Sequence, residues 1–280
     1  MLICSPGAVS SQTPSQQQTE AWNLAKSNPT ALMEAVVHKE IANSYGHHAG
    51  YRYCVRKTTL KSDTTKEIVE TPVGGVARLL QIDGHALTPQ QQQAEIARLR
   101  ALEANPSLEE HRRRREEQDA ARTEKILREL PKAFLYQLLG AVQTPSGPAI
   151  RLHFSPNPRF DPPDFEARVL TGIDGEAWID PAAERLLRID ARVSKPIDYG
   201  WAGFLGSIEP GGTILLEQTS QDGAGWRLSH LQLNLRGRAL LVKPLHYFVD
   251  ETATDFQPVP ADWTLHDAIA WLLRMEPATR

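Results

Sequence analysis

The sequence has few of the residues that most directly identify a protein class. Two cysteines, Cys4 and Cys54, occur in 280 residues, too few for a disulfide framework or a cysteine-based zinc site. We interpret Cys54, which lies in an expected strand, as a buried free thiol. A net charge of -3 argues against a nucleic-acid binder. No stretch approaches the ~18 consecutive apolar residues that a membrane-spanning helix needs.

Motifs for catalysis and cofactor binding are missing as well. The sequence contains no Gly-x-Ser-x-Gly elbow, Walker loop or dinucleotide-binding fingerprint, so we expect no cofactor. None of the nine histidines makes a His-x-x-x-His pair, and His47 and His48 would need ligands from elsewhere, so we expect no metal site. The sequence therefore favours a protein that is not an enzyme. An unrecognised hydrolase that uses His47, His48, His153 or His230 stays open as an alternative.

The clearest structural signal is a strand–turn–strand unit from Gly172 to Val193. Apolar and charged residues alternate strictly from Leu187 to Val193, the pattern of a strand with one face on a core and the other in water. Asp180 and Pro181 predict the turn between the two arms. We place this hairpin in the middle of a large antiparallel sheet.

The first arm of this hairpin also has two distinct faces. Ile173, Ala177 and Ile179 share one face, and Trp178 shares the other face with acidic residues. The carboxylates on the polar face and in the turn are expected to be solvated rather than to form a catalytic acid/base pair: Asp174, Glu176, Asp180 and Asp190.

Further strands and helices are predicted on both sides of the hairpin. Alternating or apolar segments predict strands near 51–60, 68–73, 76–82, 134–142, 149–156, 213–220 and 226–248. Helices are expected at 28–43 and 264–275, and Thr264 with Asp267 forms a capping-box variant at the start of the second. These elements predict an α+β protein dominated by one antiparallel sheet.

Residues 88–130 are predicted to form an all-helical insertion that lies outside the sheet like a flap. Thr88 is the expected cap of its first helix, and Ser107 with Glu110 forms a capping box for the second. The first half of the second helix has almost no apolar stripe, which indicates solvent on all sides. Glutamates flank the four arginines Arg112 to Arg115, so we interpret them as a self-neutralised surface rather than a phosphate-binding patch.

The N-terminus carries a damaged secretory pattern. Ala8-Val9-Ser10 follows a short apolar start, as at a signal-peptidase site, but no basic region precedes it. We interpret it as the tail of a signal peptide, and an ordinary disordered terminus stays open. A lipidated Cys4 is disfavoured because no small residues precede it. Residues 1–20 are therefore expected to be a disordered or residual signal segment, and residues 21–280 a single domain.

Two strand segments are apolar on both faces. They are FLYQLLGAV at 134–142 and ALLVKPLHYF at 239–248. A sheet with one face in water does not show this pattern. Either helices cover both faces, or one face lines a hydrophobic cavity, with the aromatic loop 199–205 at its rim.

One long stretch resembles a known family. GIDGEAWIDPAAERLLRIDARV, an aromatic glycine-rich loop and GGTILLEQTSQDGAGWRLSHLQLNLRGRALL resemble the half-barrel superfamily of periplasmic lipoprotein carriers and outer-membrane lipoprotein-sorting proteins. The family's Gly-x-x-Trp-Ile-Asp pattern is carried by Gly175, Trp178, Ile179 and Asp180. The order of segments over residues 50–250 is similar to that of uncharacterised secreted proteins of this superfamily.

The resemblance implies a strongly curved antiparallel sheet, a half-barrel, whose concave side holds acyl chains or a hydrophobic partner and is closed by helices. The insertion 88–130 and the helix 264–275 are not part of the simple carrier pattern. We therefore expect an N-terminal helix, the half-barrel sheet, the helical insertion and a C-terminal helix in one domain.

On this basis we expect a secreted or periplasmic binding protein, a monomer that shelters a lipid or lipoprotein acyl chain on the concave face of the sheet. The alternative is an envelope protein-interaction or sensor module without a lipid ligand, with helix 107–130 as its partner surface. Neither hypothesis involves a nucleic acid. The candidates for lining or rimming the cavity are Trp178, Tyr199, Trp201, Phe204 and Trp226.

Overall fold

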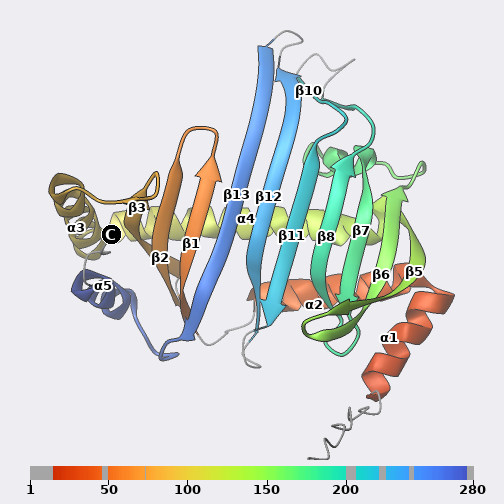
Figure 1. Ribbon diagram of the computed structural model, residues 1–280, viewed down its shortest axis with the longest axis horizontal. Helices are drawn as coiled ribbons and strands as arrows, with labels where there is room; N and C mark the ends of the chain where they lie inside the picture. The colour runs from red at the N-terminus through yellow and green to blue at the C-terminus, as the bar shows by residue number, and fades with distance from the viewer. Residues whose placement is uncertain are drawn as a thin grey trace, which may run out of the picture.

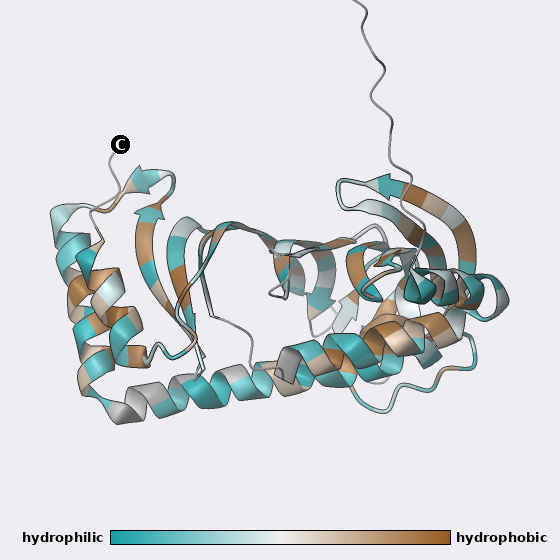
Figure 2. Cartoon of the chain, turned by 90° about the horizontal axis from the view of Figure 1, so that it is seen from below, coloured by the Kyte–Doolittle hydropathy of each residue, from teal (hydrophilic) through white to brown (hydrophobic). Residues whose placement is uncertain are grey.

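The computed structural model describes residues 15–45, 50–72, 74–199, 206–220, 225–239 and 243–275. These residues form one large antiparallel sheet of 13 strands, with one long helix running behind it (Figure 1). Seen along its edge, the sheet is an open arch (Figure 2). The predicted α+β fold with a curved, unclosed antiparallel sheet is confirmed.

The bounds of the elements follow the sequence pattern closely. The helices are α1 (Gln16–Ser27), α2 (Pro29–Tyr45), α3 (Pro89–Ala104), α4 (Pro106–Ala133), the 3-10 helix η1 (Ala167–Gly172) and α5 (Leu265–Arg274). The strands are β1 (Tyr51–Thr59), β2 (Asp63–Thr71), β3 (Gly74–Ile82), β4 (His85–Ala86), β5 (Phe134–Thr144), β6 (Gly147–Pro156), β7 (Ile173–Asp180), β8 (Arg185–Val193), β9 (Ile197–Tyr199), β10 (Gly206–Ile208), β11 (Thr213–Ser220), β12 (Trp226–Ala239) and β13 (Lys243–Pro258).

The strand order explains why the sheet needs a long connection. The order is β4-β3-β2-β1-β13-β12-β11-β8-β7-β6-β5, with β9 and β10 attached at β12. The chain leaves the sheet at β4, at one edge, and returns at β5, at the other. At ~4.8 Å between neighbouring strands, the arc between these edges is roughly 48 Å. Helix α4 has 28 residues and is about 42 Å long, so it spans the arch as a chord.

The predicted hairpin forms β7 and β8. It lies inside the sheet between β6 and β11, closer to the β5 edge than to the middle where we had placed it. The predicted turn is held by Asp180, whose Oδ1 accepts hydrogen bonds from the N–H groups of Ala182 and Ala183 at 2.7 and 2.9 Å. Trp178 pairs with Arg188 and Ile179 with Leu186, so Leu187 is the extra residue of a bulge in β8, which increases the local twist of the sheet.

The first hydrophobic core joins α1, α2 and the end of α4 to the strands β5 to β8. Its fully buried side chains include Leu32, Val36, Ile150, Leu152 and Ile179. These strand residues alternate with exposed ones, so the core covers one face of the sheet only. This end of the sheet is therefore a conventional two-layer structure.

A second, separate core joins α3 and α5 to β2 and β3. Val69 and Val76 pack there against Leu99 of α3 and Ile269 of α5. Helix α5 has the capping box expected from Thr264 and Asp267. Buried Arg78 of β3 donates hydrogen bonds to the carbonyl oxygens of Leu272 and Met275 and so satisfies the C-terminal end of α5.

Three local expectations need correction. Residues 16–20, which we expected to be disordered, are helical, because helix α1 begins at Gln16 with a Ser15 capping box. Ala21 and Ala25 dock this helix into the first core. Helix α4 begins at Pro106, which places Ser107 inside the first turn rather than at the cap. Cys54 is half-buried rather than fully buried. Residues 1–14, with the signal-like pattern and Cys4, lie outside the described residues.

The helical insertion is not a flap. Leu99 and Leu102 of α3 belong to the second core, and Leu127 and Leu130 near the end of α4 pack against the first. The cap predicted at Thr88 is present, and it forms a capping box with Gln91. Helix α4 continues through Pro131 to Ala133. The sequence pattern failed here because short apolar patches at the two ends of 88–133 each dock on a different core.

Candidate functional site

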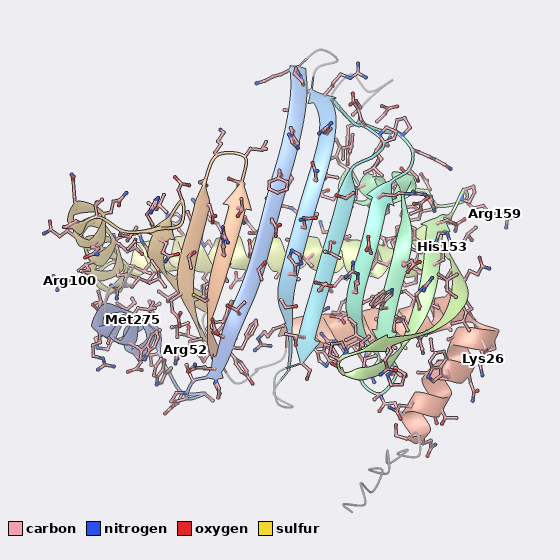
Figure 3. All side chains as sticks on the ribbon, viewed as in Figure 1. Lys26, Arg52, Arg100, His153, Arg159 and Met275 are labelled. Carbon is pink, nitrogen blue, oxygen red and sulfur yellow. The ribbon has the colours of Figure 1, made fainter. Side chains whose placement is uncertain are left out.

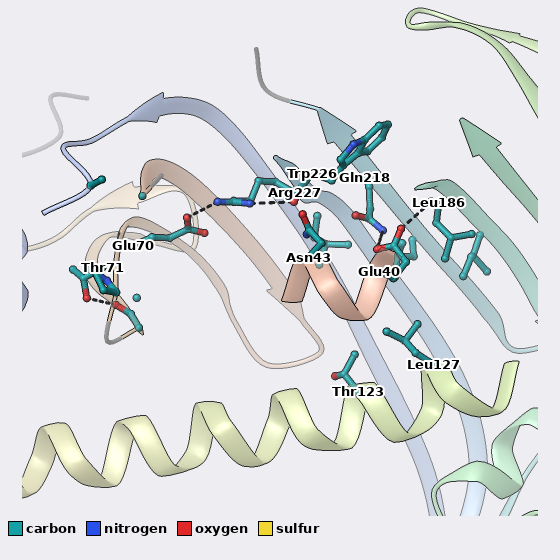
Figure 4. A pocket seen from close by; sticks show the side chains of 18 of the residues that line it. Glu40, Asn43, Glu70, Thr71, Thr123, Leu127, Leu186, Gln218, Trp226 and Arg227 are labelled. Carbon is teal, nitrogen blue, oxygen red and sulfur yellow. Dashed lines mark hydrogen bonds and ion pairs between the residues drawn. The ribbon is translucent and has the colours of Figure 1, made fainter. Parts of the chain in front are cut away.

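A large pocket lies under the arch, between α4 and the concave face of the sheet. Its volume is about 860 Å³. The floor is formed by Thr123 and Leu127 of α4, and the end of α2 closes one side (Figure 4). The apolar side chains of the sheet and α4 that line it are Leu127, Leu186, Ile189, Leu216, Trp226 and Leu228.

The pocket exists because the two cores cover opposite faces of the sheet. Val69 of β2 faces α5 in the second core, whereas its neighbour Glu70 lines the pocket. Consecutive strand residues point to opposite faces, so α3 and α5 lie on the convex side and α1 and α2 on the concave side. The concave face of the central strands β11 and β12 therefore lies opposite α4, with the end of α2 against Gln218 of β11. This part of α4 is polar and exposed, which leaves the apolar strand residues half-buried.

A buried ion pair closes one end of the pocket. Glu40 of α2 accepts hydrogen bonds from Arg185 Nε at 2.9 Å and Arg185 Nη2 at 2.8 Å. The same carboxylate accepts the N–H of Leu186 at 2.9 Å and the amide of Gln218 at 3.1 Å. Glu40 and Arg185 are each 6% exposed. Four donors thus satisfy one carboxylate, which locks α2 against β8 and β11.

A second ion pair lies toward the other end. Arg227 Nη2 of β12 donates to Glu70 Oε2 of β2 at 3.1 Å. The N–H of Tyr51 donates to the same oxygen at 3.3 Å, and the Arg227 guanidinium lies 5.2 Å from the centre of the Tyr51 ring. Arg227 also donates to the carbonyl of Trp226 at 3.2 Å. These contacts connect β2, β1 and β12 at the pocket wall.

The five residues proposed from the sequence have different positions. Trp226 lines the pocket. Trp178 lies on the opposite, convex face, where its indole N–H donates to Glu176 at 3.3 Å. Tyr199 packs on Phe165 with ring centres 4.2 Å apart, and burial raises the pKa of its hydroxyl. Trp201 and Phe204 lie outside the described residues.

The convex face carries polar side chains instead, with His153 of β6 among them (Figure 3). Arg188 of β8 pairs with Glu217 of β11 at 2.6 Å. His230 of β12 lies between Glu217 at 3.3 Å and Asp250 of β13 at 2.9 Å. The Arg188 guanidinium is 5.2 Å from the centre of the Trp178 ring. These cross-strand contacts stabilise an uncovered sheet face.

Of the four histidines named for the hydrolase alternative, His153 and His230 lie among the described residues. His230 contacts two carboxylates, and His153 of β6 lies in register with Glu176 on the same face. His47 and His48 lie outside the described residues. In the part of the chain that the structure describes, no group of three or more His, Cys, Asp or Glu could hold a metal ion, and no helix there is long and apolar enough to cross a membrane.

Sequence reasoning missed Glu40, Glu70, Arg185 and Arg227. Glu40 and Arg185 are 145 positions apart, and Glu70 and Arg227 are 157 apart. Nothing in the local pattern distinguishes them from surface charges. The apolar lining is easier to predict from the sequence. The alternation in β8 places Ile189 on a core-facing side, and Leu216 of β11 is its partner in the sheet.

The chain is similar to several solved structures, two of which have the following identities and coverages. No family model matches the chain, and no curated protein matches it. The first structure is described as an outer membrane lipoprotein-sorting protein domain from Vibrio parahaemolyticus, with 10% identity, a TM-score of 0.33, and coverage of 87% of this chain and 100% of that chain. The second is a LolA superfamily protein from Nitrosomonas europaea, with 8% identity, a TM-score of 0.27, and coverage of 81% and 93%. Both names fall in the superfamily that the sequence resembles.

Proposed function

We propose that this protein is a secreted or periplasmic binding protein that shelters a lipid or a lipoprotein acyl chain in the concave pocket. The observation that carries the proposal is the pocket itself, in which apolar strand residues face a helix that spans the arch. Its volume of about 860 Å³ is within the ~300–1,000 Å³ typical of small-molecule sites. The small-x-small pattern at Ala8 to Ser10 supports export.

Burial of apolar surface would drive binding. An acyl chain along β8, β11 and β12 would contact Ile189, Leu216 and Trp226, which the arch leaves half-buried. Each Å² of apolar surface removed from water contributes ~25 cal/mol. Trp178 lies on the other face, so we assign it no ligand contact. Trp226 is the aromatic residue that we assign to the site.

Helix α4 is the element that we expect to move for entry and release. Its ends dock on two separate cores through α3 and through Leu127 and Leu130, whereas its middle has no buried residue between His111 and Arg122 among those described. A shift of the middle or of one docked end would open the pocket without disturbing the sheet.

Native mass spectrometry after gentle extraction tests the proposal. We expect a population of the full chain to carry extra mass that solvent extraction identifies as lipid. The delipidated chain should bind the uncharged fluorescent probe N-phenylnaphthylamine. A bare mass together with no probe binding would overturn the proposal.

The alternative function is an envelope protein-interaction module. It is supported by the exposed stretch of α4, where Arg113, Arg114 and Arg115 project into solvent and Arg113 pairs with Glu117 at 3.4 Å. Removing residues 88–130 would damage both cores, so charge reversal is the better test. Arg113→Glu with Arg114→Glu should abolish capture of an envelope partner and leave probe binding unchanged if this alternative is correct. Unchanged capture would contradict it.

A further inference from the structure

The charges of the pocket lining are paired within the protein. Among the lining residues that the structure describes, the charged ones are Glu40, Glu70 and Arg227. Arg227 is paired with Glu70 at 3.1 Å, and Glu40 is paired with Arg185 at 2.8 Å. The cation in this lining therefore already has its carboxylate (Figure 4), and the second carboxylate already has its cation.

This arrangement is unfavourable for an anionic ligand. A fatty-acid carboxylate at Arg227 would compete with Glu70, which is held in place by the N–H of Tyr51 as well. It would also enter a partly dehydrated site beside the carboxylate of Glu70. Like charges at close range repel strongly where water is excluded, and a carboxylate without a cationic partner is costly to bury.

An uncharged polar head meets no such penalty. The lining offers the neutral side chains of Thr123 and Gln218, which can hydrogen-bond to hydroxyl or ester oxygens. The amide of Gln218 reaches Glu40 at 3.1 Å with one N–H and has a second N–H and a carbonyl oxygen. Neutral polar groups and apolar strand residues thus lie side by side in one pocket.

We propose that the pocket selects uncharged amphiphiles of the monoacylglycerol type over fatty-acid anions, and that the Glu70–Arg227 pair sets this selectivity. The inference rests on the proposed function and specifies the charge of the ligand. Glu70 acts by neutralising Arg227, so it is a specificity-determining residue. Exchange of its charge should change which ligand binds rather than whether any ligand binds.

Displacement of N-phenylnaphthylamine from the delipidated full chain tests the selectivity. Monolaurin and laurate have the same acyl chain and differ in head-group charge. At neutral pH, below their micelle concentrations, we expect monolaurin to displace the probe from the wild-type protein at a concentration about tenfold lower than laurate, which corresponds to about 1.4 kcal/mol.

Glu70→Gln then tests the cause. Glutamine keeps the shape and one acceptor oxygen for Tyr51 and Arg227 but removes the compensating charge. Laurate should gain about tenfold in this variant, while monolaurin stays unchanged. Glu217→Gln is the matched control, because Glu217 also pairs with an arginine, Arg188, but lies on the convex face. It should change neither ligand. A thermal melt checks that each variant is folded.

The outcomes separate this inference from the proposed function. Equal or tighter binding of laurate by the wild type overturns the selectivity and leaves lipid binding intact. An unchanged laurate affinity in folded Glu70→Gln overturns the role of the ion pair. If the probe does not bind the wild type at all, the proposed function itself fails. Should Glu70→Gln not fold, the wild-type comparison alone decides the selectivity.

Discussion

Glu40 of α2 and Arg185 of β8 form a bidentate, buried ion pair, with Nε–Oε1 and Nη2–Oε2 distances of 2.9 and 2.8 Å. The pair fixes the helix that closes one end of the pocket to the sheet that forms its wall. A carboxylate with four donors is well satisfied, but either partner alone would be a buried, uncompensated charge.

Glu40→Ala should therefore destabilise the fold by about 3–5 kcal/mol. Urea unfolding followed by circular dichroism measures this loss. Glu34→Ala is the control, since Glu34 lies on the same helix but is exposed, and it should cost less than about 0.5 kcal/mol. Similar losses in the two variants would mean that the pair does not anchor α2.

A second prediction concerns Glu95. This residue belongs to α3, the helix that covers the open side of β3. Its Oε1 accepts the N–H of Leu79 at 2.9 Å. Burial disfavours the ionised carboxylate, but hydrogen bonds from Arg98 and from the Leu79 N–H outweigh this and hold the pKa of Glu95 below its usual range. A depressed carboxyl pKa gives stability that is present above ~4.3, the ordinary glutamate value, and is lost as the pH falls through the folded pKa.

Glu95→Gln should thus lower stability at neutral pH and flatten the acid side of the stability–pH curve. Urea unfolding from neutral to acidic pH measures both effects.

Because α3 blocks pairing at this sheet edge, Glu95→Ala should also increase self-association, measured by light scattering. If the stability of Glu95→Gln falls with decreasing pH as steeply as that of the wild type, the role of this carboxylate is contradicted.

Cys54 gives a third prediction. Burial, with a contribution from neighbouring Glu67, raises the pKa of the Cys54 thiol to about 11. The thiolate is the reactive form, so Cys54 should react with iodoacetamide about 100-fold more slowly than an unperturbed cysteine. The measurement uses Cys4→Ser, which leaves one thiol. Fast labelling of the native protein, at the rate seen in urea, would contradict this.

A fourth prediction separates the two faces of the sheet. His230→Ala leaves the carboxylates of Glu217 and Asp250 without their common partner and should cost about 1 kcal/mol of stability. Probe binding should stay unchanged, because His230 lies on the convex face. Titration of the variant with N-phenylnaphthylamine measures this. A tenfold loss of affinity would indicate that the ligand binds on the convex face and would contradict our account.

The extent to which the sequence predicts this molecule depends on the range of the interactions. Strand alternation placed Trp178 on one face with acidic residues, and the structure has it on the convex side beside Glu176. Capping boxes at Thr88 and Thr264 located two helix starts. These signals act within a few residues, so they can be seen in one sequence.

The pocket could not be predicted in the same way. Its lining comes from α2, α4 and five strands, and its polar ends are pairs more than a hundred positions apart. The flap expected at 88–130 was wrong for the same reason. Leu99 and Leu127 belong to short apolar patches in otherwise polar helices, and only the strand order shows that each patch has a core to join.

The central claim is that the ligand binds on the concave face, and one pair of neighbouring residues tests it most directly. Leu216 lines the pocket, whereas Leu215, the preceding residue of β11, points to the convex face. Leu216→Trp fills the pocket and Leu215→Trp does not. In a titration with N-phenylnaphthylamine, we predict at least about a tenfold loss of affinity for Leu216→Trp and wild-type affinity for Leu215→Trp. Wild-type affinity in folded Leu216→Trp, or an equal loss in both variants, would contradict the account.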